Sequence, residues 1–329
     1  MIVVLGSRFD PHVSRVADRF DAEEVDYRIV DFLSEQELWS LHQDERGTLR
    51  LIHSDRGQVI PTLIWDRVKL LPGTDMYPKG SMESAGYLAL EWRALYNLIT
   101  TVWADRAVNP PSAKRKMLKP FQQALAAKVG FLVPQTLITT SRAEAIRFCE
   151  DAGGSVVMKS LSGGKIQPKT DGEGVPFNIM TMRVSAEDVA SAEPAQISCA
   201  PHFFQREISK SFELRVVVVD NDIFAFKINS QNFKSTELDW RNGIQLLDFS
   251  PIGLSSDVLT KIRLFMKAIG YTFGSLDFIV DTSGDLIFLE CNEDGQWAWL
   301  DDRCDMAISA AYASVLPRLA ENSSHSAHA

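Results

Sequence analysis

The chain has 329 residues and a mass of 36.8 kDa, which exceeds one ordinary domain, so two or three domains are expected. Hydrophobic residues make up 45% and charged residues 23%, as in globular chains with a sizeable core. Lys and Arg number 34 against 43 Asp and Glu, which gives a net charge of −9. This balance argues against general nucleic-acid binding, and no apolar run approaches the length of a membrane span.

The N-terminal segment and the cysteines bear on the compartment. Met1–Gly6 lacks a basic region and a long apolar region, so we expect a first β-strand there rather than a signal peptide. The four cysteines form no Cys-x-x-Cys pair, which argues against a zinc site and against a disulfide framework. We therefore expect a protein of the reducing cytoplasm.

The first third of the chain predicts a small α/β unit. Two strands and the helix between them have the spacing typical of parallel strands: Ile2–Leu5, about His12–Ala22, and Asp26–Val30. Thr48–Ile52 and Val59–Ile64 are expected to pair as a β-hairpin. Apolar residues at three- and four-residue spacing predict a long helix at Ser84–Trp103.

Asn109-Pro-Pro-Ser112 marks the first domain boundary. Beyond it, Pro120 begins a predicted helix with one apolar face, formed by Phe121, Leu125 and Val129. Ser141 is the predicted N-cap of a second helix, which ends before a strand at Ser155–Lys159.

The C-terminal part predicts a third α/β block. Its expected strands are Phe203–Ile208, Glu213–Val219, Ile223–Ile228, Ser275–Val280 and Leu286–Asn292. A helix is expected near Asp257–Ile269. The tail Glu321–Ala329 is rich in Ser, His and Ala and is expected to fray.

Two carboxylates are predicted to face each other on the last hairpin. Asp277 and Glu290 lie symmetrically about the turn, and Asn292 points to the same side. Like charges directly opposite destabilise a sheet, so a positive group is expected beside them. Oxygen ligands of this kind suit Mg²⁺ shared with substrate phosphates. A solvent-facing polar stripe is the alternative.

A lysine at a strand end suggests a phosphate site. Lys159 precedes a glycine-rich loop that holds Gly163 and Gly164, and such loops offer backbone N–H groups beside the ammonium. The loop is not a Walker A motif, because the first glycine and the Ser or Thr after Lys165 are missing. A solvated loop is the alternative.

Glu213 and Arg215 alternate to one face of a predicted strand. The carboxylate could accept ribose hydroxyls, and the arginine could hold phosphate oxygens. The alternative is a cross-strand surface ion pair, which is common and weak.

The order of these three segments resembles the ATP-grasp superfamily of carboxylate ligases. A lysine strand with a glycine loop comes first, then Glu213-Leu-Arg215, then Asp277 followed by Glu290-Cys-Asn292. The resemblance covers roughly Ser112–Leu316, and the preceding α/β unit resembles the N-terminal domain of these ligases.

A narrower resemblance lies after the acidic hairpin. Glu290-Cys-Asn292 followed by Gly295-Gln-Trp-Ala-Trp299 is similar to the graspetide synthetases, the microviridin-type ligases that form ω-ester or ω-amide crosslinks in ribosomal peptides. Cys291 departs from the aliphatic residue that many relatives carry. Aromatic packing under the site is the alternative interpretation of the two tryptophans.

The resemblance implies an α/β fold of the ATP-grasp type. An N-terminal pre-ATP-grasp domain would be followed by central (lid) and C-terminal ATP-grasp subdomains, with ATP between these two. The implied boundaries are residues 1–110, 111–202 and 203–318, with a flexible tail at 319–329.

The resemblance also implies a role for each candidate site residue. The phosphates of ATP would be held by Lys119, Lys159, Gly163 and Gly164. Backbone groups of Gln205, Arg206, Glu207 and Ile208 would face adenine, and Glu213 would take the ribose. The Mg²⁺ ligands would be Asp277, Glu290 and Asn292. Arg215 is the candidate for charge on the transferring phosphoryl group, and Arg241 for that charge or for the substrate carboxylate.

The implied enzyme is an ATP-dependent peptide macrocyclase. It would phosphorylate Asp or Glu side chains of a ribosomal precursor peptide, with leader and core, and join the acyl phosphate to a Ser/Thr hydroxyl or Lys amine. Homodimers occur in that family. The alternatives are an ATP-grasp carboxylate–amine ligase that adds an amino acid or joins small molecules, and a nucleotide-binding module without turnover.

Overall fold

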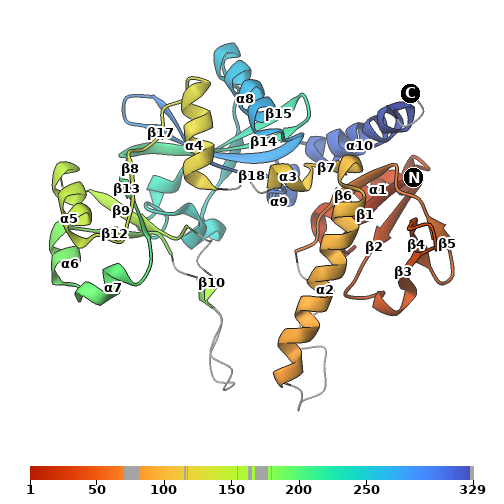
Figure 1. The fold of residues 1–329 in the computed structure, drawn as a ribbon. Coiled ribbons are helices and arrows are strands. Elements are labelled where there is room, and N and C mark those ends of the chain that lie inside the picture. The colour runs from red at the N-terminus through yellow and green to blue at the C-terminus, as the bar shows by residue number, and fades with distance from the viewer. Residues whose placement is uncertain are drawn as a thin grey trace.

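The computed structural model describes residues 1–69, 71, 82–114, 116, 118–153, 155–161, 165–166, 177–178 and 180–326 (Figure 1). Three units, each built on its own sheet, follow one another along the chain. Among the described residues, no helix is long and apolar enough to cross a membrane. Gly163 and Gly164, predicted to hold phosphate, lie outside the described residues.

The N-terminal unit is a parallel sheet in the order β2-β1-β6-β7. Its strands are β1 (Ile2–Leu5), β2 (Tyr27–Val30), β6 (Leu63–Asp66) and β7 (Ala107–Val108), and its helices are α1 (Pro11–Ala22) and α2 (Met82–Val102). The chain continues from β1 to one neighbour, β2, and later returns to the other side as β6. The carboxyl ends of β1 and β6 therefore flank the switch point at which ligands or partner segments usually lie in such sheets.

The predicted hairpin between Thr48 and Ile64 is wrong in its second half. A separate antiparallel sheet consists of β3 (Trp39–Gln43), β4 (Leu49–His53) and β5 (Gly57–Val59), whereas β6 joins the parallel sheet. Pro61 lies between β5 and β6. A proline has no N–H to extend a ladder, so the hairpin ends before it.

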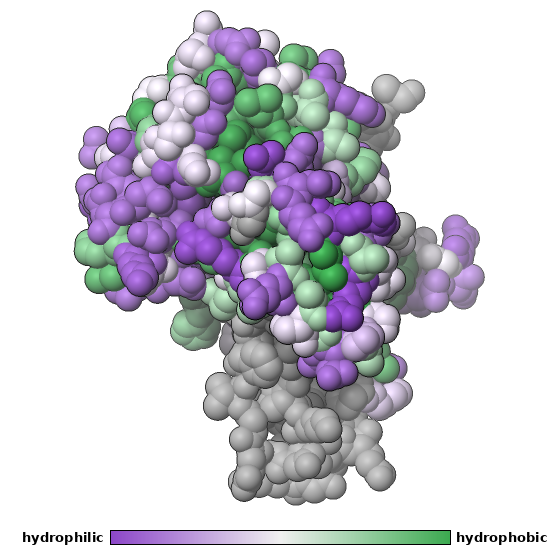
Figure 2. All heavy atoms as spheres, turned by 90° about the vertical axis from the view of Figure 1, so that its left-hand side faces the viewer, coloured by the Kyte–Doolittle hydropathy of each residue, from purple (hydrophilic) through white to green (hydrophobic). Residues whose placement is uncertain are grey.

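The central unit is an antiparallel sheet in the order β12-β9-β13-β8. Its strands are β8 (Thr136–Thr139), β9 (Val156–Lys159), β12 (Met182–Val184) and β13 (His202–Arg206). Its helices are α5 (Arg142–Asp151), α6 (Ala186–Ser191) and α7 (Pro194–Ser198). After β9, the short strands β10 (Lys165–Ile166) and β11 (Phe177–Asn178) pair with each other as a separate ribbon. Ser141 caps α5 as predicted, because its Oγ accepts the Glu144 N–H at 3.3 Å. On the face in Figure 2, hydrophobic residues lie in separate groups among hydrophilic ones.

The expected boundary between residues 202 and 203 is corrected by sheet membership. Strand β13 pairs with β8 and β9 in the central sheet, so the central unit extends to Arg206. Phe204 on this strand is buried in the core of the central unit, which holds the strand there.

The C-terminal unit is an antiparallel sheet in the order β16-β15-β14-β17-β18. Its strands are β14 (Lys210–Val219), β15 (Asp222–Ile228), β16 (Phe249–Pro251), β17 (Phe273–Asp281) and β18 (Leu286–Asn292). The helices around it are α3 (Pro111–Lys114), α4 (Lys119–Lys128), α8 (Ser256–Ile269), α9 (Ala298–Asp301) and α10 (Ala307–Ser326). Helix α8 has the predicted position and ends at Gly270, whose φ of 82° is the left-handed cap that glycine favours.

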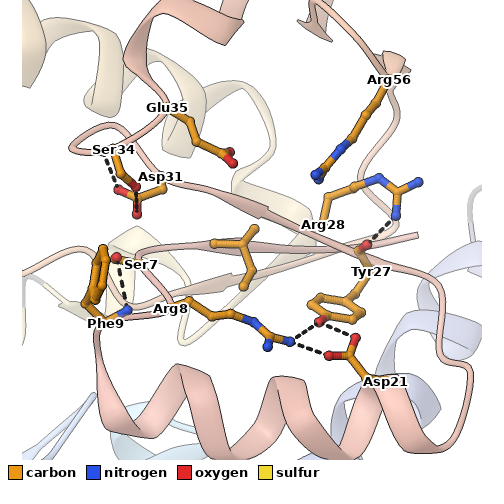
Figure 3. Close-up of a pocket in the computed structure, with 11 residues that line it drawn as sticks. Ser7, Arg8, Phe9, Asp21, Tyr27, Arg28, Asp31, Ser34, Glu35 and Arg56 are labelled. Carbon is orange, nitrogen blue, oxygen red and sulfur yellow. Dashed lines mark hydrogen bonds and ion pairs between the residues drawn. The ribbon is translucent and has the colours of Figure 1, made fainter.

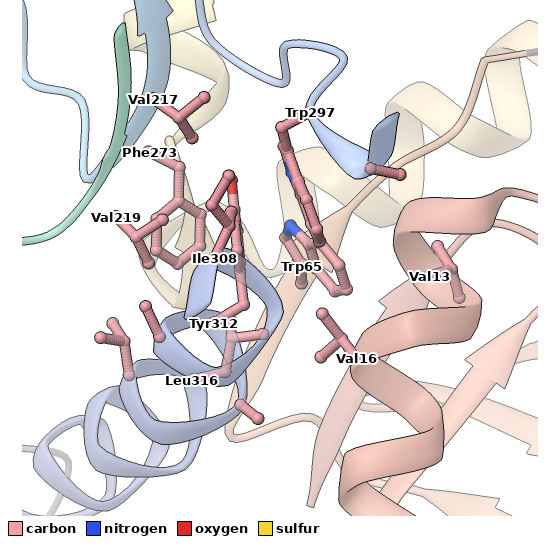
Figure 4. Close-up of a cluster of buried hydrophobic side chains, with 14 of the residues drawn as sticks. Val13, Val16, Trp65, Val217, Val219, Phe273, Trp297, Ile308, Tyr312 and Leu316 are labelled. Carbon is pink, nitrogen blue, oxygen red and sulfur yellow. The ribbon is translucent and has the colours of Figure 1, made fainter. Parts of the chain in front are cut away.

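The C-terminal tail is not frayed where the structure describes it. Helix α10 continues to Ser326, through most of the segment predicted as flexible. Leu316 and Ala320 are buried in a core that also takes Val16 from α1 and Trp65 from β6 (Figure 4). As far as Ala320 the helix packs between the N-terminal and C-terminal units, and beyond it Glu321 and Asn322 are exposed.

The predicted apolar face of α4 is borne out at Leu125 and Val129, which pack against the core of the C-terminal unit, but not at Phe121. Phe121 is 43% exposed, whereas Gln122 and Gln123 are buried. Gln122 Nε2 donates to Cys291 O at 2.8 Å, and Cys291 N donates to Gln122 Oε1 at 2.9 Å. Gln123 Nε2 donates to Leu289 O at 3.0 Å. The glutamines thus satisfy backbone groups of β18, the edge strand that would otherwise expose them.

Replacing Gln122 by Leu should therefore destabilise the protein. The buried N–H and C=O of Cys291 would lose their partner, at a cost of about 1–3 kcal/mol for each group. Denaturant unfolding measures this change. Phe121→Leu on the exposed side of the same helix is the control and should change the free energy of unfolding little. Equal stability of the two variants would contradict the assignment.

Candidate functional site

A cleft between the central and C-terminal sheets gathers most of the predicted site residues. Its lining comprises Lys119, Gln123, Lys159, Thr181, Phe203, Gln205, Lys210, Glu213, Leu238, Asp239, Trp240, Arg241, Asp277, Ile279, Leu289 and Glu290. An adjoining pocket shares Lys159 and Gln205 and adds three predicted residues, Arg206, Glu207 and Ile208. Arg215 on β14 and Asn292 on β18 are not among the described residues that line either pocket.

The prediction that two carboxylates face each other on adjacent strands is confirmed. Asp277 on β17 and Glu290 on β18 are register partners, and their side chains are only 14% and 16% exposed. Arg215 Nη1 donates to both carboxylate oxygens of Asp277 at 2.9 Å, and Lys119 Nζ lies 3.3 Å from Glu290 Oε2. The pair is therefore not a solvent-facing stripe, and cations offset its like charges as expected.

The two carboxyl groups differ in their electrostatics. Burial raises the pKa of Asp277 above its usual value, although Arg215 opposes this. For Glu290, burial acts in the same direction, but Lys119 and Arg241 outweigh it and hold its pKa below the usual value. Glu290 is thus the carboxylate that the surrounding cations keep ionised.

The acidic pair has the chemistry of a magnesium site. Among the described residues, no group of three or more His, Cys, Asp or Glu side chains could hold a metal. The predicted ligands are two carboxylates and the amide of Asn292, and the structure places Asn292 on β18 with Ser275 as its register partner. An incomplete set of oxygen ligands fits Mg²⁺, which completes its octahedron with water and substrate phosphates.

Lys159 stands at the carboxyl end of β9 with a neutral partner. Its Nζ donates to Gln205 Oε1 at 2.8 Å, and Gln205 Nε2 donates to Thr136 Oγ1 at 3.1 Å. Burial lowers the pKa of Lys159 to about 8, and the charge of Lys119 acts in the same direction. A buried ammonium whose bonded partner is an amide is suited to a phosphate oxygen.

Glu213 and Arg215 do not form the surface ion pair that was the alternative. Both are buried, and Glu213 Oε1 accepts from Lys210 Nζ at 2.7 Å. Burial raises the pKa of Glu213, against the attraction of Lys210. Lys210 also donates to Leu238 O at 3.1 Å, so it links the backbone at Leu238 to the carboxylate of Glu213. Sequence reasoning missed Lys210, although it precedes Glu213 by three residues.

Arg241 is held against the cleft by a carboxylate of its own. Its Nε and Nη2 donate to the two oxygens of Asp239 at 2.8 and 2.7 Å, and Asp239 also accepts the Arg241 backbone N–H at 3.1 Å. Burial opposes ionisation of Asp239, but Arg241 keeps its pKa below the usual value. The guanidinium is therefore positioned before any ligand arrives.

Two backbone N–H groups of the segment predicted to face adenine already form hydrogen bonds within the protein. Arg206 N donates to Gln135 O and Glu207 N donates to Ser155 O, both at 2.9 Å. The Glu207 side chain pairs with Arg183 at 2.7 to 3.0 Å. The two backbone N–H groups thus hold the end of β13 at the pocket edge.

The two tryptophans after the hairpin pack in the core. Trp297 is fully buried and stacks on Tyr312, with ring centroids 4.9 Å apart (Figure 4). Trp299 meets Phe249 edge to face at 4.3 Å. Aromatic packing, the alternative interpretation, is confirmed for both. The backbone beside them reaches the site, because Gln296 O accepts from Arg215 Nη2 at 3.2 Å.

A separate pocket lies in the N-terminal unit, and its described lining contains none of the predicted site residues (Figure 3). Arg8 pairs there with Asp21 and Tyr27, and Arg28 and Glu35 complete a lining of mixed charge. Charges of both signs line this pocket, as they line the cleft, but the described linings of the two sites share no residue.

No family model matches the sequence, and no curated protein does. Solved structures do match. A Chryseobacterium gregarium RiPP-associated ATP-grasp ligase, in complex with ADP and a leader and core peptide, is 25% identical over 96% of each chain, with a TM-score of 0.84. Macrocyclase MdnC from Microcystis aeruginosa MRC, bound with precursor peptide MdnA, is 21% identical over 97% of this chain and 100% of its own, with a TM-score of 0.80. The ATP-grasp ligase PsnB, solved with minimal precursor, Mg and ADP, is 21% identical over 97% and 98%, with a TM-score of 0.75. The predicted fold and resemblance are confirmed over nearly the whole chain.

Gly295 in the segment after β18 can be tested directly. A Cβ built on Gly295 would overlap the Ser275 side chain and lie 3.1 Å from Arg215 Nη2. Gly295→Ala should lower the free energy of unfolding by about 1–3 kcal/mol, as overpacked sites do. Ser275→Gly in the same chain should recover most of the loss, because it removes the overlapping atoms. Denaturant midpoints of the single and double variants measure this, and a double variant no more stable than Gly295→Ala would contradict it.

Proposed function

We propose that this chain is an ATP-grasp ligase that crosslinks a ribosomally made precursor peptide through acyl-phosphate chemistry. One observation supports this most: the paired charges of the cleft occur in a chain that matches ligases solved with leader and core peptides over nearly its full length. All four cysteines are free, in keeping with the cytoplasm as the proposed compartment.

We propose that ATP lies in the cleft, with its phosphates toward the acidic pair. Lys159 and Lys119 bind phosphate oxygens, and Glu213 accepts from the ribose hydroxyls. The backbone at residues 205–208 faces adenine. Asp277, Glu290 and Asn292 hold Mg²⁺, which supplies charge neutralisation at the phosphates when bound. The ammonium of Lys159, which now donates to the amide of Gln205, would then donate to a phosphate oxygen.

The proposed reaction has two steps. An oxygen of a substrate Asp or Glu carboxylate attacks the γ-phosphorus of ATP, the bond to the β-phosphate oxygen breaks, and ADP leaves. The resulting acyl phosphate has a better leaving group than hydroxide. A Ser or Thr hydroxyl, or a Lys amine, then attacks the acyl carbon, loses its proton and displaces inorganic phosphate. The peptide thereby loses the elements of one water for each crosslink.

The protein's contribution is to position groups and offset charge. Arg215 neutralises charge on the transferring phosphoryl group from behind Asp277, which it already binds. Arg241 binds the phosphoryl group or the substrate carboxylate, and Asp239 orients it. The closed cleft would keep water from the acyl phosphate, which water hydrolyses.

The second candidate is an ATP-grasp ligase that joins an amino acid or another small amine to a carboxylate. The same cleft would activate the carboxylate, and only the nucleophile would differ. The paired charges suit both reactions. The two are separated by the product mass, since joining an amine adds mass whereas an internal crosslink removes it.

We expect the enzyme with MgATP and the acidic peptide encoded beside its gene to yield a peptide lighter by one water per bond. ADP should form in equal amount. Glu290→Gln should abolish both, because it removes a metal ligand and the partner of Lys119. Asp285→Asn, the same change on the exposed turn of this hairpin, is the control and should retain activity. Intact-mass analysis decides: a mass gain favours the amine ligase, and no turnover with any substrate would contradict an enzyme function.

The proposed role of Lys159 predicts a pH dependence. Its pKa of about 8 in the free protein means that the ammonium loses its proton as pH rises through 8. ADP affinity should be full below that pH and should fall above it, by up to about 10-fold per pH unit. Lys159→Arg should bind ADP with a constant affinity to pH 9, because arginine stays charged. Calorimetry measures both, and parallel pH profiles for the two proteins would contradict the role.

A further inference from the structure

The segment that follows the metal-ligand strand is held by the N-terminal unit. We call residues 293–297 the site loop, which joins β18 to α9. Asn109 Nδ2 donates to Glu293 O at 2.8 Å. Arg67 Nη1 donates to the carbonyl of the next residue, Asp294, and lies 3.5 Å from that of Gly295. Side chains from the far side of a unit boundary therefore bind successive carbonyls of the site loop.

Asp10 holds the guanidinium of Arg67 in place beside the site loop. Arg67 follows β6 at the switch point of the parallel sheet, and its side chain is 1% exposed. Its Nε and Nη2 donate to Asp10 Oδ2 at 3.3 and 3.1 Å. The carboxylate holds one edge of the planar guanidinium, so the remaining N–H groups point at the site loop.

His12 binds the other end of the site loop. Its Nε2 lies 2.9 Å from the backbone N of Trp297, which donates to it, so Nε2 carries no proton. Nδ1 lies 2.5 Å from Asp10 Oδ1 and holds the proton. Burial lowers the pKa of His12, which favours this neutral form. Asp10 thus orients both His12 and Arg67, and α1 and β6 act together on the site loop.

The site loop in turn touches the proposed phosphoryl site. Gln296 O accepts from Arg215 Nη2 at 3.2 Å, while Arg215 Nη1 binds Asp277. The space left for movement is small, because Gly295 packs directly on Ser275 and Arg215. A shift of the site loop would therefore move the guanidinium relative to the acidic pair.

We infer that Arg67 is a positioning residue for phosphoryl transfer, acting through the site loop on Arg215 and on the metal-ligand strand. The N-terminal unit then helps to set the geometry of the nucleotide site through its contacts with the site loop. The inference rests on the proposed nucleotide site but not on which peptide or amine is the second substrate. Small displacements of catalytic groups are enough to matter, since about 1 Å can cost 100-fold in rate.

Arg67→Lys is the test, with Arg15→Lys as the matched control. Lysine keeps the charge beside Asp10 but cannot bind the carboxylate and the carbonyls at once. Arg15 binds Asp302 at 2.7 and 2.9 Å across the same unit boundary, away from the site loop. Both variants thus weaken the contact between units, and only one of them releases the site loop.

We expect Arg67→Lys to lower the kcat for ADP formation on the order of 10- to 100-fold, and to raise the KM for ATP only as far as its Mg²⁺-dependent binding weakens. Arg15→Lys should keep the kcat of the natural protein. Melting temperatures of both variants show how much folding contributes. If Arg67→Lys keeps its kcat, or if the two variants lose kcat and melting temperature in proportion, the inference is overturned.

Binding of ADP decides the inference even if no peptide is crosslinked. In the natural protein Mg²⁺ should strengthen ADP binding, measured by calorimetry with and without the ion. Arg67→Lys should lose most of this gain and retain metal-free affinity, because the site loop that directly follows Asn292 is no longer held by Arg67. A pair at position 12 extends the test: His12→Gln keeps an acceptor for Trp297 N and should retain part of the gain, whereas His12→Leu should not. Unchanged gains in all these variants would overturn the inference.

Discussion

The site depends on two carboxylates placed opposite each other on adjacent strands of a mostly buried sheet. Asp277 and Glu290 repel each other there, and the low dielectric of the interior makes the repulsion costly. The chain therefore has to bring cations from elsewhere, and it does so from two sides. Arg215 comes from the neighbouring strand β14, and Lys119 from the first turn of α4. The position of α4 and the register of β14 thus both serve to place a cation beside the acidic pair.

The strand that carries Glu290 is also an edge strand, which adds a second constraint. Its outer backbone groups need partners that keep it rigid without extending the sheet. Gln122 and Gln123 of α4 supply them, together with the backbone of Leu132, whose carbonyl accepts from Phe288 N at 2.9 Å. The helix that brings the lysine thus also seals the edge, so charge compensation and backbone satisfaction come from one element.

The N-terminal unit is joined to the rest by more than a linker. A continuous core runs from α1 and β6 to α10 and includes Trp297, which stacks on Tyr312 (Figure 4). The polar network of Asp10, His12 and Arg67 lies at the edge of this core and ends on the site loop. Close packing of apolar side chains gives the interface its strength, and the buried hydrogen bonds give it a definite geometry.

The sequence by itself determined the strand that bears Lys159, the facing pair Asp277 and Glu290, and the order of segments that indicates the fold. These features are local, because alternation along a strand and symmetry about a turn need no distant partner. Tertiary structure alone decided which sheet takes β6 and β13, why α4 buries glutamines, and how Arg67 reaches the site loop. Those outcomes depend on backbone groups of residues far away in the chain, and a pattern of side-chain types contains no information on which of these will be left without a partner.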